Sequence, residues 1–463
     1  MRITLSEKIC ALALADLCKV LARGEKTWIT GISSDSREVM EGDLFLCLKG
    51  ERTDGAAYIP QALAHGAVAV LTSEEVSPAG GGYWHFAAPS ALGVIERMAA
   101  ARRARFSGRV IGVTGSVGKT TAKEVISAVL GQVPHSEGNY NSTLGMPLSL
   151  LSLSDAPFWV LELGINHQGE MERMGRVLFP DIGVLCSVGT AHIGELGGKE
   201  AILREKTALS HFLPPGGGFL VPYDILSEKR GFLAPSCHLF SFGARNDADF
   251  SAENITYGKY GTRLDFKARD RCITNLEWPL SGTAGVSALL IGCALGVMCG
   301  RSDEEIRTGI TVAARGIPHR REVKVGERIL IDDSYNASPE AVEAALEALR
   351  YRAPERVRVA VLGDMLELGE YSAELHCKVG KRVVESGISM LFTYGDEALH
   401  IANAARAFGM PAHCVVAVRR GARRELLDAM HRLIPEDAAV LFKASRAVCL
   451  GRVFEEFGGC HVR

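Results

Sequence analysis

The stretch that decides the fold is Val113-Thr114-Gly115-Ser116-Val117-Gly118-Lys119-Thr120-Thr121. An apolar segment, residues 110–113, runs into this glycine-rich turn, and a helix-like segment follows over residues 122–130. Glycines let backbone N–H groups turn toward a phosphate, and the helix N-terminus adds the positive end of its dipole. Lys119 can neutralise nucleotide phosphates, and the Thr120 hydroxyl can ligate Mg²⁺. Val113 stands where the strict loop pattern has its first glycine, but the flanking strand and helix favour a phosphate-binding loop over a turn that merely holds a lysine.

Length and composition limit the classes of protein that this chain can form. With 463 residues it exceeds a single core, so several domains are expected. The 52 Lys and Arg residues are balanced by 54 Asp and Glu, which gives no basic surplus for a nucleic-acid partner. The cluster Arg102-Arg103-Ala104-Arg105 therefore indicates a solvated helix end near a domain boundary.

Cysteine usage and hydropathy indicate a cytoplasmic protein without a membrane span. The 12 cysteines form no C-x-x-C pair, which favours reduced thiols over disulfides or a zinc site. The longest apolar segment, residues 284–299, is shorter than the roughly 20 residues that a bilayer requires, so a buried core helix is predicted there.

The pattern of strands and helices predicts an α/β protein of three domains. The N-terminal block, residues 1–106, is expected to open with a short amphipathic helix and to continue as an α/β domain. The central block, 107–313, contains the phosphate loop and is expected to form a P-loop ATPase-like parallel sheet. The C-terminal block, 314–463, has strands alternating with helices and is expected to form a Rossmann-like domain. Strands are predicted over 158–163 and 182–188 in the central block, and over 329–331, 359–362 and 390–394 in the last.

Polar residues follow the predicted central strands, at the edge where open α/β sheets bind ligands. Glu162 ends one strand, and a carboxylate beside a phosphate loop is a natural Mg²⁺ ligand. His192 follows the next strand and is either a further ligand or an ordinary loop residue. Lys206 ends a predicted helix over 200–206 and, taken alone, is more typical of a solvated surface lysine than of a functional residue.

Together these segments resemble the Mur ligases, the ATP-dependent amide-forming enzymes of peptidoglycan synthesis. That family shows a T-G-x-x-G-K-T loop, a Glu at a strand end, a strand ending near A-H and a lysine on the following helix. The family's lysine is carbamylated and bridges two Mg²⁺ ions, and Lys206 matches it. The resemblance implies that ATP is held by residues 114–121, with Lys119 catalytic, and that Mg²⁺ is held by Thr120, Glu162, His192 and carbamylated Lys206.

Three further stretches resemble the family members that join D-alanyl-D-alanine to UDP-N-acetylmuramoyl-tripeptide. They are residues 32–55, which resemble a uridine-nucleotide domain; Asp332-Asp333-Ser334-Tyr335-Asn336-Ala337-Ser338-Pro339; and residues 362–372 (L-G-D-M-L-E-L-G-E-Y-S) with His376. The resemblance implies those two compounds and ATP as ligands, an acyl-phosphate route, closure of the third domain, and a monomer.

Individual roles follow from the same resemblance. Asp333 would hold the ribose and Asn336 the adenine of ATP, and Arg320 would reach the γ-phosphate, with Arg321 one residue away. The UDP-substrate would contact Ser34, Asp35, Ser36, Arg37, Asn139 and Asn141. The acceptor dipeptide would lie near Lys443, Ser445 and Arg446.

Several positions depart from the family pattern. The H-N-x-x-N motif near adenine is replaced by Ala284, Gly285 and Ala288, and Ser142 and Ala444 stand where Asn and Gly are usual. An active enzyme with altered base recognition is expected. Two alternatives stay open: a sister amide ligase, either the tripeptide-forming Mur ligase or a folylpolyglutamate synthetase, and an ATP-binding protein without activity.

Overall fold

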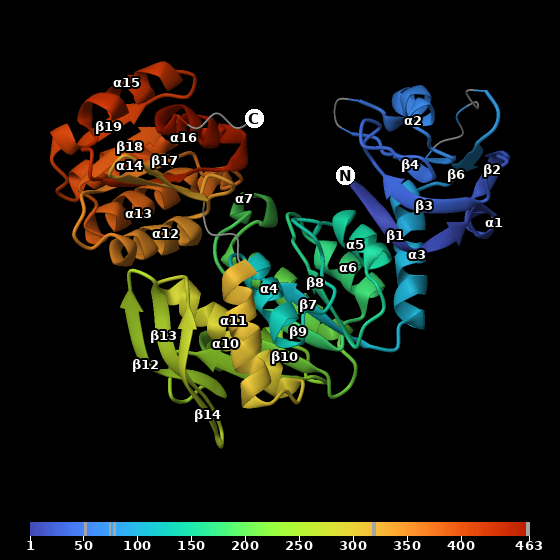
Figure 1. Cartoon of the computed structure of the whole chain (residues 1–463), viewed down its shortest axis with the longest axis horizontal. Helices are drawn as coiled ribbons and strands as arrows, with labels where there is room; N and C mark the ends of the chain where they lie inside the picture. Colours follow the sequence, from blue (N-terminus) through green and yellow to red (C-terminus); the bar gives the residue numbers. More distant parts are fainter. Residues whose placement is uncertain (51–52, 74–75, 77–79, 317–320, 460–463) are drawn as a thin grey trace.

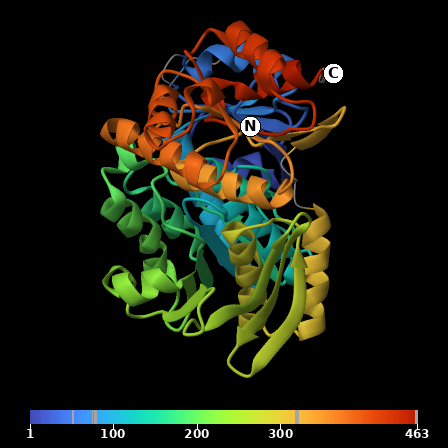
Figure 2. The same cartoon turned by 90° about the vertical axis from the view of Figure 1, so that its left-hand side faces the viewer.

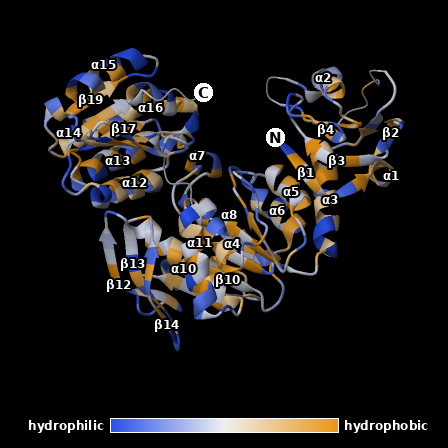
Figure 3. Ribbon diagram, viewed as in Figure 1, coloured by the Kyte–Doolittle hydropathy of each residue, from blue (hydrophilic) through white to orange (hydrophobic). Residues whose placement is uncertain are grey.

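The computed structural model describes residues 1–50, 53–73, 76, 80–316 and 321–459. Each of the three predicted blocks contributes one sheet, and the N-terminal, central and C-terminal domains are named here by these sheets (Figure 1). The expected three-domain α/β architecture is confirmed. Hydrophobic residues concentrate in the strands and in the helix faces that cover them (Figure 3). Among the described residues no helix is both long and apolar enough to span a bilayer.

The N-terminal domain is a six-stranded sheet in the order β1-β3-β4-β5-β6-β2. Its inner pairs are parallel, whereas β1 and β2 pair antiparallel at the two edges. The strands are β1 Arg2–Cys10, β2 Lys19–Ala22, β3 Trp28–Ser33, β4 Asp43–Cys47, β5 Ala69–Thr72 and β6 Trp84–Ala87, and the helices are α1 Ala11–Leu14, α2 Ile59–Ala64 and α3 Ala91–Arg105.

The amphipathic helix expected at the start of the chain is wrong. Residues 2–10 form β1, and only the single turn α1 follows. Ile3 and Leu5 are buried while Thr4 and Ser6 are exposed, the two-residue period of a strand. The strand is fixed by its antiparallel partner β3, whose paired residues lie 18 to 31 positions further along the chain, and a local pattern does not reveal this.

The central domain has eight strands in the order β14-β13-β12-β11-β10-β9-β7-β8. The predicted parallel sheet extends from β8 to β12, and two antiparallel hairpins, β12–β14, prolong it. These hairpins lie below the C-terminal domain in both views (Figures 1 and 2). The strands are β7 Arg109–Thr114, β8 Phe158–Glu162, β9 Ile182–Leu185, β10 Gly218–Pro222, β11 His238–Gly243, β12 Phe250–Gly258, β13 Gly261–Ala268 and β14 Arg271–Trp278.

Helices cover both faces of this sheet. They are α4 Lys119–Val129, α5 Gly145–Ser152, α6 Glu170–Leu178, α7 Ile193–Leu196, α8 Lys199–Thr207, α9 Tyr223–Lys229, α10 Thr283–Met298 and α11 Asp303–Gly316. The predicted buried helix is α10, and its glycines let α4 approach closely. A Cβ at Gly292 would lie 2.2 Å from Val125 Cγ1, so only glycine fits there without a shift. This packing holds α4, and with it the phosphate loop, against the core.

The C-terminal domain is a six-stranded sheet in the order β15-β16-β20-β17-β18-β19, parallel except for the edge pair β15–β16. The strands are β15 Arg321–Val325, β16 Arg328–Asp332, β17 Arg358–Gly363, β18 Met390–Tyr394, β19 Val415–Val418 and β20 Ala439–Lys443. The helices are α12 Pro339–Arg352, α13 Ser372–Glu385, α14 Ala398–Ala407, α15 Arg423–Leu433 and α16 Leu450–Gly458. Short 3-10 turns lie at Gly55–Tyr58, Ala208–Phe212, Arg230–Phe232, Gly369–Tyr371, Ala412–Cys414 and Arg446–Val448.

The arginine cluster at the end of α3 lies at a domain boundary, as expected, and Arg105 is exposed, but Arg102 and Arg103 are not solvated, contrary to expectation. Arg102 is 6% exposed, binds Asp155 Oδ1 at 2.7 Å and lies over the Trp159 ring. Arg103 donates to the carbonyl of Leu178 at 2.9 Å. The two arginines therefore fasten α3 of the N-terminal domain to the central domain, since their charges find acceptors across the boundary.

Candidate active site

The phosphate loop lies between β7 and α4, as the sequence predicts. Gly115 has φ +153°, and a Cβ there would lie 2.9 Å from Cys186 Cβ, so the tight approach of the loop to β9 requires glycine. Val117 N–H donates to Ser187 Oγ at 2.9 Å, and Lys119 Nζ donates to the Gly115 carbonyl at 2.8 Å. Lys119 is thus held over its own loop, at the N-terminus of α4, where an anion is favoured.

Glu162 lies at the carboxyl end of β8, beside the loop. Its side chain is buried at 2% exposure and accepts two hydrogen bonds, from Thr120 Oγ1 at 2.9 Å and from Asn141 Nδ2 at 2.7 Å. Carboxylate and hydroxyl oxygens are the donors that Mg²⁺ prefers, so this pair fits the expected ion. No group of three His, Cys, Asp or Glu side chains suited to a metal occurs in the described part of the chain. A Mg²⁺ ion here would therefore need oxygens from substrate phosphates and water as well.

Lys206 lies in the last turn of α8 and is not a surface lysine. Only 2% of it is exposed, and burial, followed by the positive charge of Lys119, lowers the pKa of Lys206 to about 7. Cys186 lies near the same charges, and burial raises the pKa of its thiol to about 12, so it stays protonated. Lys206 is therefore a buried amine of which a substantial fraction is in the neutral, nucleophilic form near neutral pH.

His192 precedes α7 and faces the C-terminal domain. Its backbone has a left-handed φ of +61°. His192 Nδ1 lies 2.5 Å from Glu367 Oε2, a polar contact whose alignment falls short of a regular hydrogen bond. The contact with His192 lowers the pKa of the Glu367 carboxyl, which therefore remains ionised. Because Nδ1 is engaged, Nε2 is the ring nitrogen that can ligate a metal.

Asp333 and Asn336 follow β16 and meet a buried lysine of β20. Lys443 Nζ donates to Asp333 Oδ2 at 2.8 Å and to the Asn336 carbonyl at 3.0 Å. Lys443 was predicted on the acceptor side, but the structure groups it with the predicted nucleotide residues. Ser445 Oγ accepts the Leu366 N–H at 2.9 Å, and Arg446 lies over the Tyr335 ring.

One cavity of about 1000 Å³ lies between the central and C-terminal domains, and Lys206, Ser445 and Arg446 are not among its lining residues. Its lining includes the loop residues 116–121, Glu162, His192, Asp333, Asn336 and Lys443. Asn139 and Asn141 also line it, whereas Ser34, Asp35, Ser36 and Arg37 do not. Arg320 lies outside the described residues, as do the side-chain contacts of Arg321.

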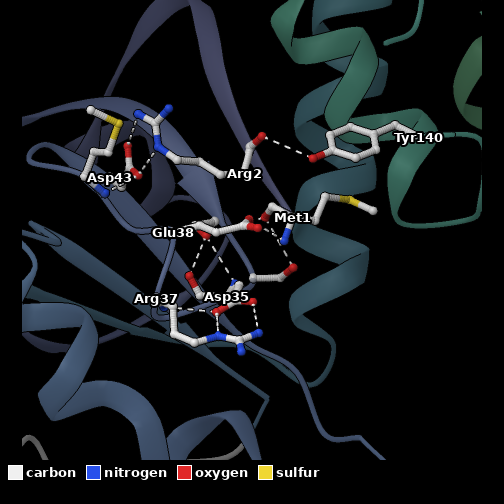
Figure 4. A network of polar contacts seen from close by, with 10 residues as sticks. Met1, Arg2, Asp35, Arg37, Glu38, Asp43 and Tyr140 are labelled. Atoms are coloured by element: carbon white, nitrogen blue, oxygen red, sulfur yellow. Dashed lines mark hydrogen bonds and ion pairs between the residues drawn. The ribbon is translucent and has the colours of Figure 1, made fainter. Parts of the chain in front are cut away.

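The predicted uridine-side residues lie elsewhere, in the loop after β3 (Figure 4). Arg37 donates to both oxygens of Asp35, and its side chain holds the pKa of that carboxyl well below its ordinary value. Tyr140, between Asn139 and Asn141, points toward the Arg2 carbonyl of β1 with its hydroxyl 3.4 Å away. The loop over 139–142 thus connects the N-terminal domain to Glu162.

Family models match all three domains of this chain. The Mur ligase family catalytic domain matches residues 28–105, the Mur ligase middle domain residues 113–296, and the Mur ligase glutamate ligase domain residues 319–446. The UDP-N-acetylmuramoyl-tripeptide–D-alanyl-D-alanine ligase of Synechocystis sp. is 34% identical over 95% of this chain and 94% of its own. The chain belongs to the Mur ligase family.

Other relatives and solved structures similar to this chain are named as ligases of the same kind. The Escherichia coli protein of the same name is 29% identical and covers 96% of this chain and 98% of its own. A crystal structure of MurF from Acinetobacter baumannii superposes with a TM-score of 0.86 at 27% identity, covering 99% of this chain and all of that one. MurF ligase from Thermotoga maritima, in complex with ADP, gives 0.78 at 27% identity over 93% of this chain and 97% of its own.

The departures from the Mur ligase pattern at α10 have a structural basis. Thr283, Ala284, Ser287 and Ala288 line the cavity, so small side chains form this wall. At Gly285 a Cβ would lie 2.0 Å from the Leu280 carbonyl oxygen, which excludes any larger residue with this backbone. The wall of α10 therefore offers a nucleotide base little beyond van der Waals contact and the Thr283 and Ser287 hydroxyls.

Two carboxylates at the site were not predicted. Glu340 of α12 accepts hydrogen bonds from Thr190, and Glu367 contacts His192. Glu367 lies within segment 362–372, and the resemblance of that segment to the family was the one signal that pointed to Glu367. The sequence alone does not state that this residue faces another domain.

Proposed function

We propose that this Mur ligase joins D-alanyl-D-alanine to UDP-N-acetylmuramoyl-tripeptide at the expense of ATP, forming ADP and phosphate. The observation that supports this most is the cavity in which the phosphate loop and the buried carboxylate of Glu162 lie opposite Asp333 and Lys443 of another domain. The names of the relatives, which cover nearly the whole chain, supply the substrate class.

The chemistry proceeds by an acyl phosphate. The terminal carboxylate of the tripeptide attacks the γ-phosphorus of ATP and expels ADP, because a carboxylate alone is a poor acylating agent. The amine of D-alanyl-D-alanine then attacks the acyl carbon, and the tetrahedral adduct releases phosphate to leave the amide. Lys119 and the N-terminus of α4 stabilise the negative charge on the phosphates during transfer.

Glu162 and Thr120 would supply oxygen donors to Mg²⁺, and His192 Nε2 would be a further ligand. The ion, when bound, supplies charge neutralisation at the phosphates. Lys206 completes the site as a carbamate: its neutral amine adds to CO₂ and loses one proton, giving an anionic oxygen ligand. Burial and the low pKa of Lys206 support this, since only the neutral amine reacts.

On the substrate side, we assign the UDP-muramoyl moiety to Ser34, Asp35, Ser36 and Arg37, with Asn139 and Asn141 near the reacting end. Asp333 and Asn336 take the ribose and adenine, and Arg320 the γ-phosphate once the C-terminal domain closes. Such closure keeps water from the acyl phosphate. The acceptor lies near Ser445 and Arg446. Lys443 serves Asp333 more directly, given their 2.8 Å contact.

Phosphate release tests the proposal with ATP, Mg²⁺ and UDP-N-acetylmuramoyl-tripeptide, with and without D-alanyl-D-alanine. Release that requires both muramoyl peptide and dipeptide is expected. Release with a single amino acid and a shorter peptide would instead indicate a sister ligase. Binding of ATP without release in any mixture would indicate a protein that binds the nucleotide only. Replacing ATP by GTP in the same assay tests base recognition, which the small-residue wall of α10 is expected to relax.

A further inference from the structure

The segment from Gly189 to Gly194 is held from two sides. On the central side, Gly189 N–H donates to Ser116 Oγ of the phosphate loop at 2.8 Å. On the other side, the C-terminal domain contacts the segment at Thr190, His192 and Gly194. This segment carries His192, so its position decides where the imidazole stands relative to the phosphates.

Glu340, at the start of α12, binds the segment at Thr190. Its Oε1 accepts both the backbone N–H and the hydroxyl of Thr190, each at 2.9 Å. A Cβ at Gly189 would lie 2.6 Å from Glu340 Cδ, so glycine is needed for the carboxylate to reach in. Two hydrogen bonds to a charged acceptor fix Thr190 against the C-terminal domain.

Glu367 contacts the same segment two residues later, at His192. Its side chain contacts His192 Nδ1 at 2.5 Å, and its own carbonyl accepts the Gly194 N–H at 3.2 Å. His192 and Glu367 both adopt a left-handed φ, +61° and +65° respectively, which non-glycine residues rarely keep without support. His192 and Glu367 belong to different domains, and the contact between them supports the backbone conformation of each.

A third carboxylate crosses the interface far from His192. Glu347, two turns after Glu340 on α12, accepts the Thr283 N–H at 3.1 Å and its hydroxyl at 2.9 Å, at the start of α10. This contact docks the same helix onto the central domain but does not touch the segment 189–194. A variant at Glu347 therefore tests domain docking separately from the positioning of His192.

We propose that Glu340 and Glu367 are positioning residues that place His192 at the metal site only when the C-terminal domain is docked. A carboxylate behind a metal-ligating imidazole orients its ring and commonly contributes 10- to 100-fold in metal affinity or activity. Here that carboxylate comes from another domain, so docking and metal binding are coupled. The inference rests on the proposed function for the identity of the metal site.

Mn²⁺ binding followed by electron paramagnetic resonance tests this in the presence of ADP, alongside kcat and KM for phosphate release. For Glu340→Gln and Glu367→Gln we expect Mn²⁺ affinity to fall about 10- to 100-fold and kcat to fall with it. Glu347→Gln, which weakens docking without touching the segment 189–194, should raise the KM for ATP and lower Mn²⁺ affinity by less than the other two variants do. Glu370→Gln, an exposed carboxylate beside the same turn, should match wild type throughout.

The outcomes separate the two proposals. Wild-type Mn²⁺ affinity in both Glu340→Gln and Glu367→Gln, or no nucleotide-dependent Mn²⁺ binding by the wild type, would overturn the positioning role. Equal losses in Glu347→Gln would also overturn it, because they would show a general effect of docking. Normal Mn²⁺ behaviour without phosphate release from any muramoyl substrate would instead contradict the proposed function alone. Thermal melting of each variant confirms that it is folded.

Discussion

Asn141 Nδ2 lies 2.7 Å from Glu162 Oε1, and this hydrogen bond connects the loop that meets the N-terminal domain to the strand end beside the phosphate loop. The neighbouring Tyr140 points to the Arg2 carbonyl of β1. One short loop therefore contacts the domain assigned to the muramoyl substrate and the carboxylate assigned to Mg²⁺. Substrate binding on one side can in this way affect the metal ligand on the other.

Replacing Asn141 by alanine is expected to weaken the use of Mg²⁺. The change removes a donor that orients the buried Glu162 carboxylate, and loss of such a partner behind a metal ligand commonly costs about 10- to 100-fold in metal affinity, so we expect roughly tenfold more Mg²⁺ to be needed for half-maximal phosphate release. Asn139→Ala, on the exposed side of the same loop, should leave the Mg²⁺ dependence unchanged. Identical Mg²⁺ titrations for Asn141→Ala and wild type would show that the bond has no such role.

Replacing Lys206 by alanine is expected to leave almost no activity, with partial rescue by short carboxylic acids that supply the missing oxygen ligands. Carbon-13 NMR with labelled bicarbonate gives a readout that does not depend on turnover: a carbamate signal is expected in the wild type and not in Lys206→Ala. Lys199→Ala, an exposed lysine at the other end of α8, is the matched control and should keep both signal and activity. Full activity of Lys206→Ala would remove the carbamate from the mechanism.

Much of this site could be predicted from the sequence, because the chemistry of a phosphate loop is written in consecutive residues. Gly115, Gly118, Lys119 and Thr120 lie where the sequence predicts them, in the turn between β7 and α4 and at the start of that helix. The strand end at Glu162 and the buried helix α10 were likewise predicted from short apolar segments of the sequence. The family resemblance then connected Lys206 and Asp333, which no local pattern joins.

The remainder depended on contacts between distant segments. The strand β1 is a strand because it pairs with β3, and Arg102 is buried because Asp155 and Trp159 lie across a domain boundary. Glu340 and Glu367 acquire their roles only when α12 and the turn after β17 are docked on another domain. Periodicity and composition report on neighbours along the chain, so they are silent on such pairs.

The low pKa of Lys206 predicts a pH-dependent stability. Its pKa is lowered from 10.5 to about 7 in the folded chain, so between these values the unfolded chain holds a proton that the folded chain has released. Protonation therefore favours unfolding, and stability rises with pH over roughly pH 7 to 10, with the destabilisation fully present below that window. In CO₂-free buffer, Lys206→Met should exceed wild type in melting temperature most at about pH 6.5 and least near pH 9.5. Parallel pH curves for the two proteins would contradict the burial of a protonatable lysine, and Lys199→Met should track wild type.

Docking of the C-terminal domain depends on a second close approach, between two glycines. A Cβ at Gly194 would lie 2.6 Å from the Gly369 N atom, yet the backbone of Gly194 lies outside the left-handed region and alanine is itself a good helix former. Gly194→Ala should therefore leave α7 intact and push the two domains apart. We expect a larger radius of gyration by small-angle X-ray scattering with ADP and a KM for ATP raised about tenfold or more, because a misplaced positioning contact of even 1 Å is costly. Gly231→Ala, whose Cβ would meet nothing within 4 Å, is the control. A wild-type scattering profile and KM for Gly194→Ala would mean that the interface between α7 and the turn at Gly369–Tyr371 opens during turnover and does not govern closure.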